Sequence, residues 1–139
     1  MEKYRFLEHT ADVLFESYGK SFEEALENAA EAMFSVMCDA GKLNEERSFA
    51  VKEEADSLEN LAVFTLSAIL SQSEIDEVLP KRFMVEKFAK KGGVFSISGK
   101  VYGGKWESGK VKTDIKAVTH HLIKVEGNGK FMIRILLDI

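Results

Sequence analysis

The sequence predicts an α+β protein with a mostly antiparallel sheet and two helices packed on it. Two segments with apolar residues at helical spacing each begin with a polar capping signal. Alternating, strand-like segments surround them, and residues 81–139 contain only such segments. The predicted order is therefore ββαβα followed by ββββ, within a single domain spanning residues 1–139.

The first predicted elements are two strands and a helix. Tyr4–Leu7 and Val13–Gly19 read as strands, and the polar turn His9–Asp12 separates them. Ser21–Glu24 has the pattern of a capping box, in which a serine and a glutamate satisfy each other's main-chain donors. We expect the helix that follows to run to about Cys38 and to pack closely on a sheet, because its buried stripe is rich in alanine.

A third strand and a second helix come next. Residues 48–54 alternate between polar and apolar types, which predicts a strand. Asp56 and Glu59 resemble a second capping box, with Asp56 as the N-cap of a helix that ends near Gln72. This helix is apolar over more than one face, so we expect it to be buried between the sheet and the first helix.

The remaining strand-like segments form two hairpins. In chain order these segments are Arg82–Ala89, Val94–Tyr102, Val111–Glu126 and Lys130–Asp138. Lys90–Gly93 joins the first pair, and Gly127–Gly129 joins the second in a turn that requires positive φ. Gly103–Gly109 is expected to be a loose tip between the hairpins.

Composition indicates an ordinary globular protein, with 45% hydrophobic and 30% charged residues. No apolar segment of a signal peptide follows Met1, and the longest apolar-rich stretch, Leu61–Leu70, is too short to span a bilayer. Cys38 is the only cysteine, so no internal disulfide is available. We therefore expect a cytoplasmic protein without a membrane partner.

Charge is distributed unevenly along the chain, whose formal net charge is −4. Residues 1–80 contain 6 Lys/Arg and 18 Asp/Glu, a net of −12, whereas residues 81–139 contain 13 and 5, a net of +8. Either the two halves mix on the folded surface, or the molecule has an acidic and a basic face. The overall acidity argues against stable, stand-alone RNA binding, because binding phosphates requires concentrated Lys and Arg.

Carboxylates near the two ends of the chain form a candidate metal site. Asp12 ends the first polar turn, and Asp138 follows an apolar strand and precedes Ile139. That strand would bring Asp138 to a sheet end, where Asp12 is a geometrically plausible neighbour. With the terminal carboxylate they would supply hard oxygen ligands for Ca²⁺, Mg²⁺ or Mn²⁺. Taken alone, Asp12 also fits an ordinary turn residue and Asp138 a frayed terminal acid.

No catalytic arrangement is recognisable in the sequence. There is no legible Ser/His/Asp or Cys/His set. Gly104–Lys110 fits the first part of a phosphate-binding loop, but Val111 stands where that loop needs Ser or Thr. A strand rather than a helix is predicted after it, so the anion-binding helix N-terminus is missing as well. We therefore do not expect an enzyme.

Three motifs, in order, resemble the archease family over almost the whole chain. They are His9-Thr10-Ala11-Asp12 with Gly19 and the helix start at Ser21–Ala25, then Lys116–Thr119 with His121, and finally Asp138-Ile139. Residues 90–112 show little of the family pattern. His120 stands where the family pattern leads us to expect an aromatic residue, and its role is open.

The resemblance implies a specific function. Archease proteins are small accessory factors that promote guanylation and multiple turnover of the GTP-dependent tRNA-splicing ligase and broaden its NTP use. The resemblance also implies a divalent metal site, with Ca²⁺ the expected ion, at Asp12, Asp138 and the terminal carboxylate of Ile139. A chaperone-like partner of an RNA cytosine methyltransferase is the alternative function.

Three further residues are expected around this site or at a partner contact. His9 either orients Asp12 through a hydrogen bond or fills a polar core position. Lys116 either faces a phosphate or is a solvated lysine of the sheet. His120 and His121 are adjacent on a predicted strand, so they face opposite sides and do not share a metal ion, which leaves His121 as a candidate partner contact.

Overall fold

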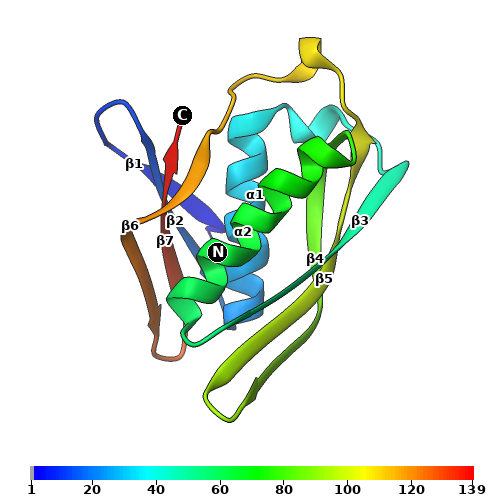
Figure 1. The fold of residues 1–139 in the computed structure, drawn as a ribbon. Helices are drawn as coiled ribbons and strands as arrows, with labels where there is room; N and C mark the ends of the chain where they lie inside the picture. Colours follow the sequence, from blue (N-terminus) through cyan, green and yellow to red (C-terminus); the bar gives the residue numbers. More distant parts are fainter. Residues whose placement is uncertain (1) are drawn as a thin grey trace.

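The first helix carries a broad apolar stripe and the second is apolar over more than one face, so both need cover from other elements. In the computed structural model, which describes residues 2–139, the helices lie between two antiparallel sheets (Figure 1). The helices are α1 (Phe22–Met37) and α2 (Leu58–Ile75). Neither helix in the described part of the chain is long and apolar enough to cross a membrane.

The seven strands within residues 2–139 divide into a four-stranded and a three-stranded sheet. The first sheet has the order β1 (Tyr4–Leu7), β2 (Val13–Gly19), β7 (Phe131–Asp138) and β6 (Ala117–Gly127). The second has the order β3 (Arg47–Ala55), β5 (Val94–Lys105) and β4 (Val78–Lys91). The predicted α+β class and element order are confirmed, and the division into two sheets is a feature that the sequence had not indicated.

The core lies between the sheets. Phe15, Ile135 and Leu137 point from β2 and β7 toward α1 and are fully buried. Fully buried alanines, Ala25 and Ala29 among them, let α1 approach this sheet closely. α2 contacts β6 on one side and β3, β4 and β5 on the other, so it lies between the two sheets and not, as expected, between one sheet and α1.

The helix starts are largely as predicted. Ser21 caps α1 by accepting a hydrogen bond from Glu24 N at 3.1 Å, and the Glu24 carboxylate accepts one from Lys20 N at 3.1 Å. The N-cap of α2 is Ser57, so the assignment of Asp56 to this position was wrong. Ser57 Oγ accepts from the main chain of Asn60, and the Asp56 carboxylate binds the Asn60 side-chain amide instead.

The region between the hairpins differs from prediction. β5 continues to Lys105, so residues 103–105 are not part of a loose tip. β6 begins only at Ala117, and residues 112–116 cross between the two sheets without strand pairing. Trp106 is half-buried against the core, and its main-chain N–H donates to Glu77 O at 2.8 Å. Residues 112–116 connect one sheet to the other, and the alternation of polar and apolar residues that predicted a strand here does not reveal such a connection.

The β4–β5 hairpin contains two register shifts, each next to a glycine of β5. The shifts lie at Pro80/Arg82 and Val85/Lys87, facing Gly103 and Gly99 respectively. A Cβ atom on Gly103 would overlap the carbonyl oxygen of Leu79. Pro80 is tolerated in β4 because this is an edge strand, where a missing N–H leaves no partner unpaired.

We expect Gly103→Ala to lower the free energy of unfolding by about 2 kcal/mol or more, because the overlapping atom is main chain and cannot rotate away. The matched control is Gly109→Ala, since no atom lies within 4 Å of a Cβ built there. Urea denaturation of both variants measures the difference. Equal stability of the two variants would show that the strand approach at Gly103 is looser than described.

Candidate functional site

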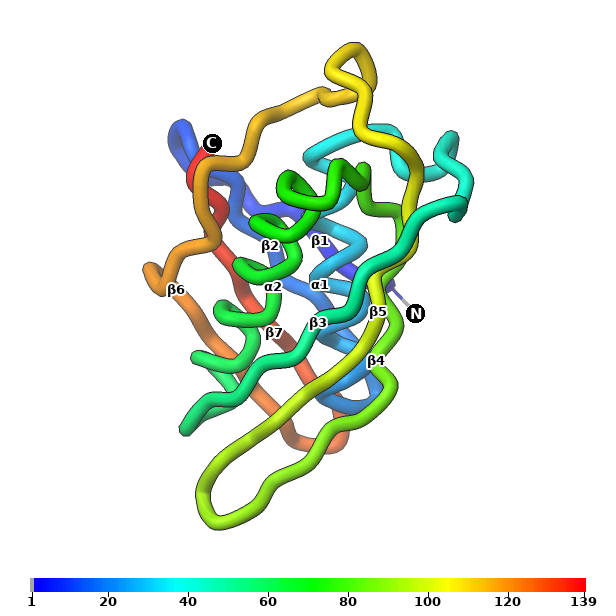
Figure 2. The backbone as a smooth tube through the Cα atoms, turned by 45° about the vertical axis from the view of Figure 1, so that its right-hand side comes forward, coloured from blue at the N-terminus to red at the C-terminus, as the bar shows by residue number. Residues whose placement is uncertain are grey.

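The pairing of β2 with β7 brings Asp12 and Asp138 to the same end of the sheet. Val13 lies opposite Leu137 in this antiparallel ladder, so the next residues outward in the same register are Asp12 and Asp138. Figure 2 shows the C-terminus beside the loop between β1 and β2. Asp12 and Asp138 therefore each lie one residue beyond the last pair of the ladder, and their direct contact stays a prediction.

A tight turn sets the position of Asp12. Ala11 has a φ of 67°, and Asp12 N donates a hydrogen bond to Thr10 O at 2.8 Å. This i to i+2 bond closes a γ-turn with a positive φ at its centre, a strained conformation for a residue with a side chain. Asp12 is half-buried, whereas Asp138 is exposed. The strain is thus stored directly beside one of the two candidate ligands.

Main-chain hydrogen bonds connect Asp138 to β6 and to the residue before that strand. Lys116 N donates to Asp138 O at 2.7 Å, and Ala117 lies opposite Asp138 in the β6–β7 ladder. The Lys116 side chain is exposed. Lys116 therefore lies next to the carboxylate pair along the chain path, with its ammonium group in solvent.

The three histidines lie in different surroundings. His9 is exposed in the β1–β2 loop, where it lines a shallow hollow with Glu8 and Thr10. No hydrogen bond links His9 to Asp12 in the described structure, which leaves the orienting role a prediction. His120 packs edge-on against Phe64 of α2, with ring centroids 5.8 Å apart.

His121 lies in an irregular part of β6. Thr119 faces Leu136 and Lys124 faces Arg134, so four residues of β6 oppose a single residue of β7. Leu122 within this bulge has a φ of 62°. The register puts His121 beyond Thr119 and farther than Thr119 from Asp138 along the ladder. No glycine, proline or other turn signal in the sequence marks this bulge.

The oxygen atoms of these carboxylates are suitable ligands for a hard divalent cation, but the side chains alone are too few to hold one. Asp12 and Asp138 supply carboxylate oxygens, which Ca²⁺ and Mg²⁺ prefer. Within residues 2–139, no three His, Cys, Asp or Glu side chains cluster closely enough to hold a metal ion. Ile139, the third ligand that the family resemblance implies, follows Asp138 and is 36% exposed, and its role as a ligand stays a prediction.

An ion-pair network on the same face of the sheet was not identified from the sequence. The Glu16 carboxylate accepts hydrogen bonds from Arg134 Nη2 at 2.9 Å and from Tyr18 Oη at 3.1 Å, and Arg5 Nη2 lies 3.7 Å away. Burial by itself would raise the pKa of Glu16, but these hydrogen bonds and the two arginine charges outweigh it and lower the pKa. Glu16 and Arg134 are directly opposite, so the network stabilises the register that brings Asp12 and Asp138 to the same end of the sheet.

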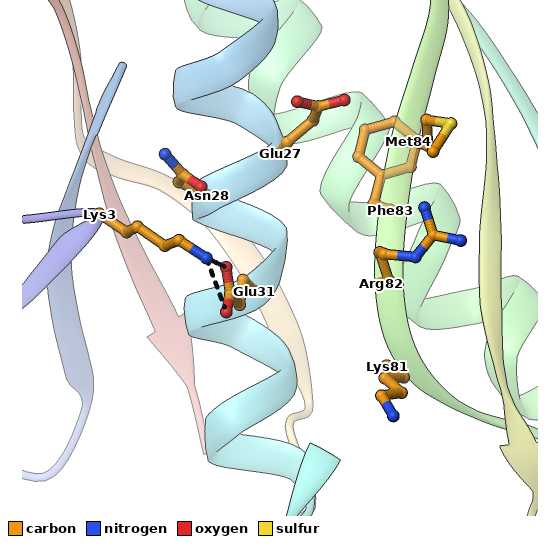
Figure 3. Close-up of a pocket in the computed structure, with 8 residues that line it drawn as sticks. All are labelled: Lys3, Glu27, Asn28, Glu31, Lys81, Arg82, Phe83 and Met84. Atoms are coloured by element: carbon orange, nitrogen blue, oxygen red, sulfur yellow. Dashed lines mark hydrogen bonds and ion pairs between the residues drawn. The ribbon is translucent and has the colours of Figure 1, made fainter. Parts of the chain in front are cut away.

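A cleft between α1 and β4 is a poorer candidate for a functional site. Figure 3 shows Lys3 paired with Glu31 on its α1 side, at 3.2 Å. Its other charged side chains are engaged too, since Glu27 accepts from Val85 N and Lys81 donates to Leu43 O. The cleft is lined by Lys3, Glu27, Asn28, Glu31, Lys81, Arg82, Phe83 and Met84. The Glu27 bond joins α1 to β4, the other two contacts tie neighbouring segments to these elements, and a structural role accounts for all three.

Comparison with known proteins gives consistent relatives. The sequence model of the family described as "Archease protein family (MTH1598/TM1083)" matches residues 4–139. Protein archease of Methanosarcina mazei is 40% identical over 99% of this chain and 97% of its own length. Protein archease of Sulfolobus acidocaldarius is 33% identical over the full length of both chains.

Two solved structures share the fold. The solution structure of Methanobacterium thermoautotrophicum protein 1598 aligns with a TM-score of 0.84 at 27% identity, over 100% of both chains. A Thermotoga maritima crystal structure, described as an archease and possible chaperone, aligns with a TM-score of 0.59 at 21% identity, over 96% of this chain and 94% of that one. The second likeness concerns the fold alone.

We expect Glu16→Gln to lower the free energy of unfolding by about 2 kcal/mol at neutral pH, because Arg134 loses its charged partner. The folded-state pKa of Glu16 is lowered, so its contribution is complete above the unfolded-state value near 4.5 and is lost as pH falls through the folded-state pKa. The stability difference between wild type and variant should therefore shrink below about pH 4.5.

Urea denaturation at a series of pH values measures this difference. Glu126→Gln is the control, since Glu126 forms an exposed pair with Lys124 and should contribute about 0.5 kcal/mol or less. A difference between wild type and Glu16→Gln that stays constant down to pH 3 would contradict the assigned network.

Proposed function

The chain belongs to the archease family, and on that premise we propose that it is an accessory protein that activates the GTP-dependent tRNA-splicing ligase. In this proposal it promotes guanylation of the ligase, sustains multiple turnover and broadens the nucleotides that the ligase accepts. It is a protein cofactor, not an enzyme of its own, and it acts in the cytoplasm in tRNA processing. The position of Asp12 and Asp138 at one sheet end is the observation that carries the proposal.

We further propose that this sheet end holds a divalent cation. Asp12, Asp138 and the terminal carboxylate of Ile139 would be its ligands, and Ca²⁺ is the ion that such oxygen ligands suit, with Mg²⁺ and Mn²⁺ as alternatives. When bound, the ion supplies a positive centre that attracts phosphate oxygens. The carboxylates hold it and offset its charge, and the strained turn at Ala11 fixes the Asp12 backbone.

The surroundings of the carboxylates support an approach of the ligase from this end. Lys116 and His9 are exposed there and have no side-chain hydrogen bond or ion pair within the described residues. Both are therefore free to contact a partner or its bound nucleotide. His121, on the exposed bulge of β6, would contact the ligase farther along the same strand.

Ca²⁺ should stabilise the protein against unfolding. At a Ca²⁺ concentration about a hundredfold above the Kd, we expect the free energy of unfolding to rise by about 2.7 kcal/mol, because only the folded chain brings both carboxylates to one sheet end. Asp12→Asn and Asp138→Asn should remove most of this gain in thermal unfolding experiments. Asp114→Asn, an exposed acid without an ion pair in the described structure, should keep it. Equal gains in all variants would refute the assigned ligands.

Substoichiometric amounts of the protein should restore multiple-turnover RNA ligation by the cognate ligase. We expect Asp12→Ala to reduce this stimulation at least about tenfold, because loss of a ligand weakens metal binding at least as much as loss of a residue that supports a ligand. Asp114→Ala is the matched control. The readout is joined RNA per ligase molecule over time.

Each outcome of the ligation experiment is informative. Stimulation by Asp12→Ala equal to that by wild type would overturn the carboxylate site. Stimulation only at equimolar amounts, or none, would favour the alternative function, a chaperone-like partner of an RNA cytosine methyltransferase, because a chaperone acts stoichiometrically on its client.

A further inference from the structure

The outer face of the β3–β5–β4 sheet is not covered by any other element in the described part of the chain. Both helices pack on the inner face, where Val51, Ile97 and Val101 are buried. Because side chains alternate along a strand, Lys52, Ser98 and Lys100 lie on the opposite, outer face. This face is therefore a broad surface open to solvent.

Four lysines gather on this face. Lys52 and Lys87 lie opposite Ser98 from its two sides, since both β3 and β4 pair with β5 at that residue. Lys100 is two residues along β5, at a distance of about 7 Å, and Lys91 lies opposite Val94 at the other end of the strand. The lysines thus follow β5 over about 20 Å, the length of six residues.

None of these four lysines has an acidic partner among residues 2–139. The ion pairs of the described structure involve other lysines and arginines, including Arg82, which binds Glu45 at 2.9 Å. Glu54 lies opposite Ser96 and is exposed on the same outer face, and neither it nor Glu86 forms an ion pair among the described residues. The face therefore carries four lysines and one glutamate, a net of +3.

The hairpin that forms most of this face is the most basic part of the chain. The β4–β5 hairpin, residues 78–105, contains seven Lys or Arg and one Glu, a net of +6. The rest of the chain contains 12 Lys or Arg and 22 Asp or Glu, a net of −10. A chain with a net charge of −4 therefore still has a locally basic face, of the kind that binds phosphates.

We propose that this lysine face, formed by Lys52, Lys87, Lys91 and Lys100, binds the phosphate backbone of single-stranded nucleic acid. A row of unpaired cations along one strand matches a partner whose negative charges are also arranged in a row. Ser96 and Ser98 lie between the lysines; they are small, and their hydroxyls donate to phosphate oxygens.

An acidic protein is a less suitable occupant. Stable protein interfaces have an apolar, well-packed centre with a polar rim. Here the centre is Ser98 between two lysines, and the exposed apolar residues Met84 and Val94 lie on either side of it along the hairpin. Binding to nucleic acid would be weak and dependent on salt, which is compatible with the expectation that this acidic chain does not bind RNA stably by itself.

The test is fluorescence anisotropy of a labelled oligouridine RNA of about 16 nucleotides, titrated with the full chain at several NaCl concentrations. Three or four phosphate contacts predict a slope of log K against log salt of about −2 to −3. The triple variant Lys52→Gln, Lys87→Gln, Lys100→Gln should reduce the slope by about 2 and the affinity at low salt by about tenfold.

The control variant carries Lys20→Gln, Lys112→Gln and Lys130→Gln, three exposed lysines without ion pairs in the described residues and outside this sheet. It has the same net charge as the test variant and should bind like wild type. Absence of salt-dependent binding by wild type, or an equal loss in the control, would overturn the proposal. So would displacement of the RNA by polyglutamate at an equal concentration of charge, which would indicate an acidic protein as the occupant.

This inference goes beyond the proposed function and does not depend on it. The assay contains no ligase and is run in EDTA, and Asp12→Ala should bind the RNA as wild type does. Thermal unfolding of each variant verifies that the sheet remains folded. Failure of RNA binding would therefore leave ligase activation untouched, and failure of ligase activation would leave RNA binding untouched.

Discussion

The pairing of β2 with β7 is the constraint on which the rest of the molecule depends, because it joins the two ends of the chain in the middle of one sheet. Phe15 lies opposite Ile135 and both are fully buried, while Glu16 lies opposite Arg134 on the other face. A slip of one residue would expose the first pair and bury the second, so the register is fixed from both faces. That same ladder ends at Val13 and Leu137, so the position of Asp12 and Asp138 at one sheet end is a consequence of how the core packs.

Enclosing both helices between two sheets leaves each sheet with one outer face, and the two outer faces differ in chemistry. One presents the Glu16 ion-pair network, with the carboxylates of Asp12 and Asp138 at its end. The other presents lysines without acidic partners. A protein of 139 residues can in this way keep a site that suits a cation apart from a surface that suits phosphates, because a packed core separates them.

Part of the candidate site was predictable from the chain, and part was not. Asp12 and Asp138 stand out as acids at the ends of apolar strands, and the family motifs identify them independently. Their neighbours were harder to find. Glu16 and Arg134 alternate with apolar residues in the same strands, so both are visible as outward-facing charges, but their partnership exists only once β2 and β7 are paired. The four-residue bulge after Thr119, with positive φ at Leu122, has no signal in the sequence.

The sequence by itself determined the local elements, since periodicity, capping residues and turn glycines act within a few residues of one another. It thus set the positions of both helices, the order of the strands along the chain, and the turn that requires positive φ at Gly129. Only the tertiary structure decided that the strands form two sheets and that residues 112–116 cross between the sheets unpaired. These outcomes depend on contacts between residues far apart in the chain, which a local pattern does not encode.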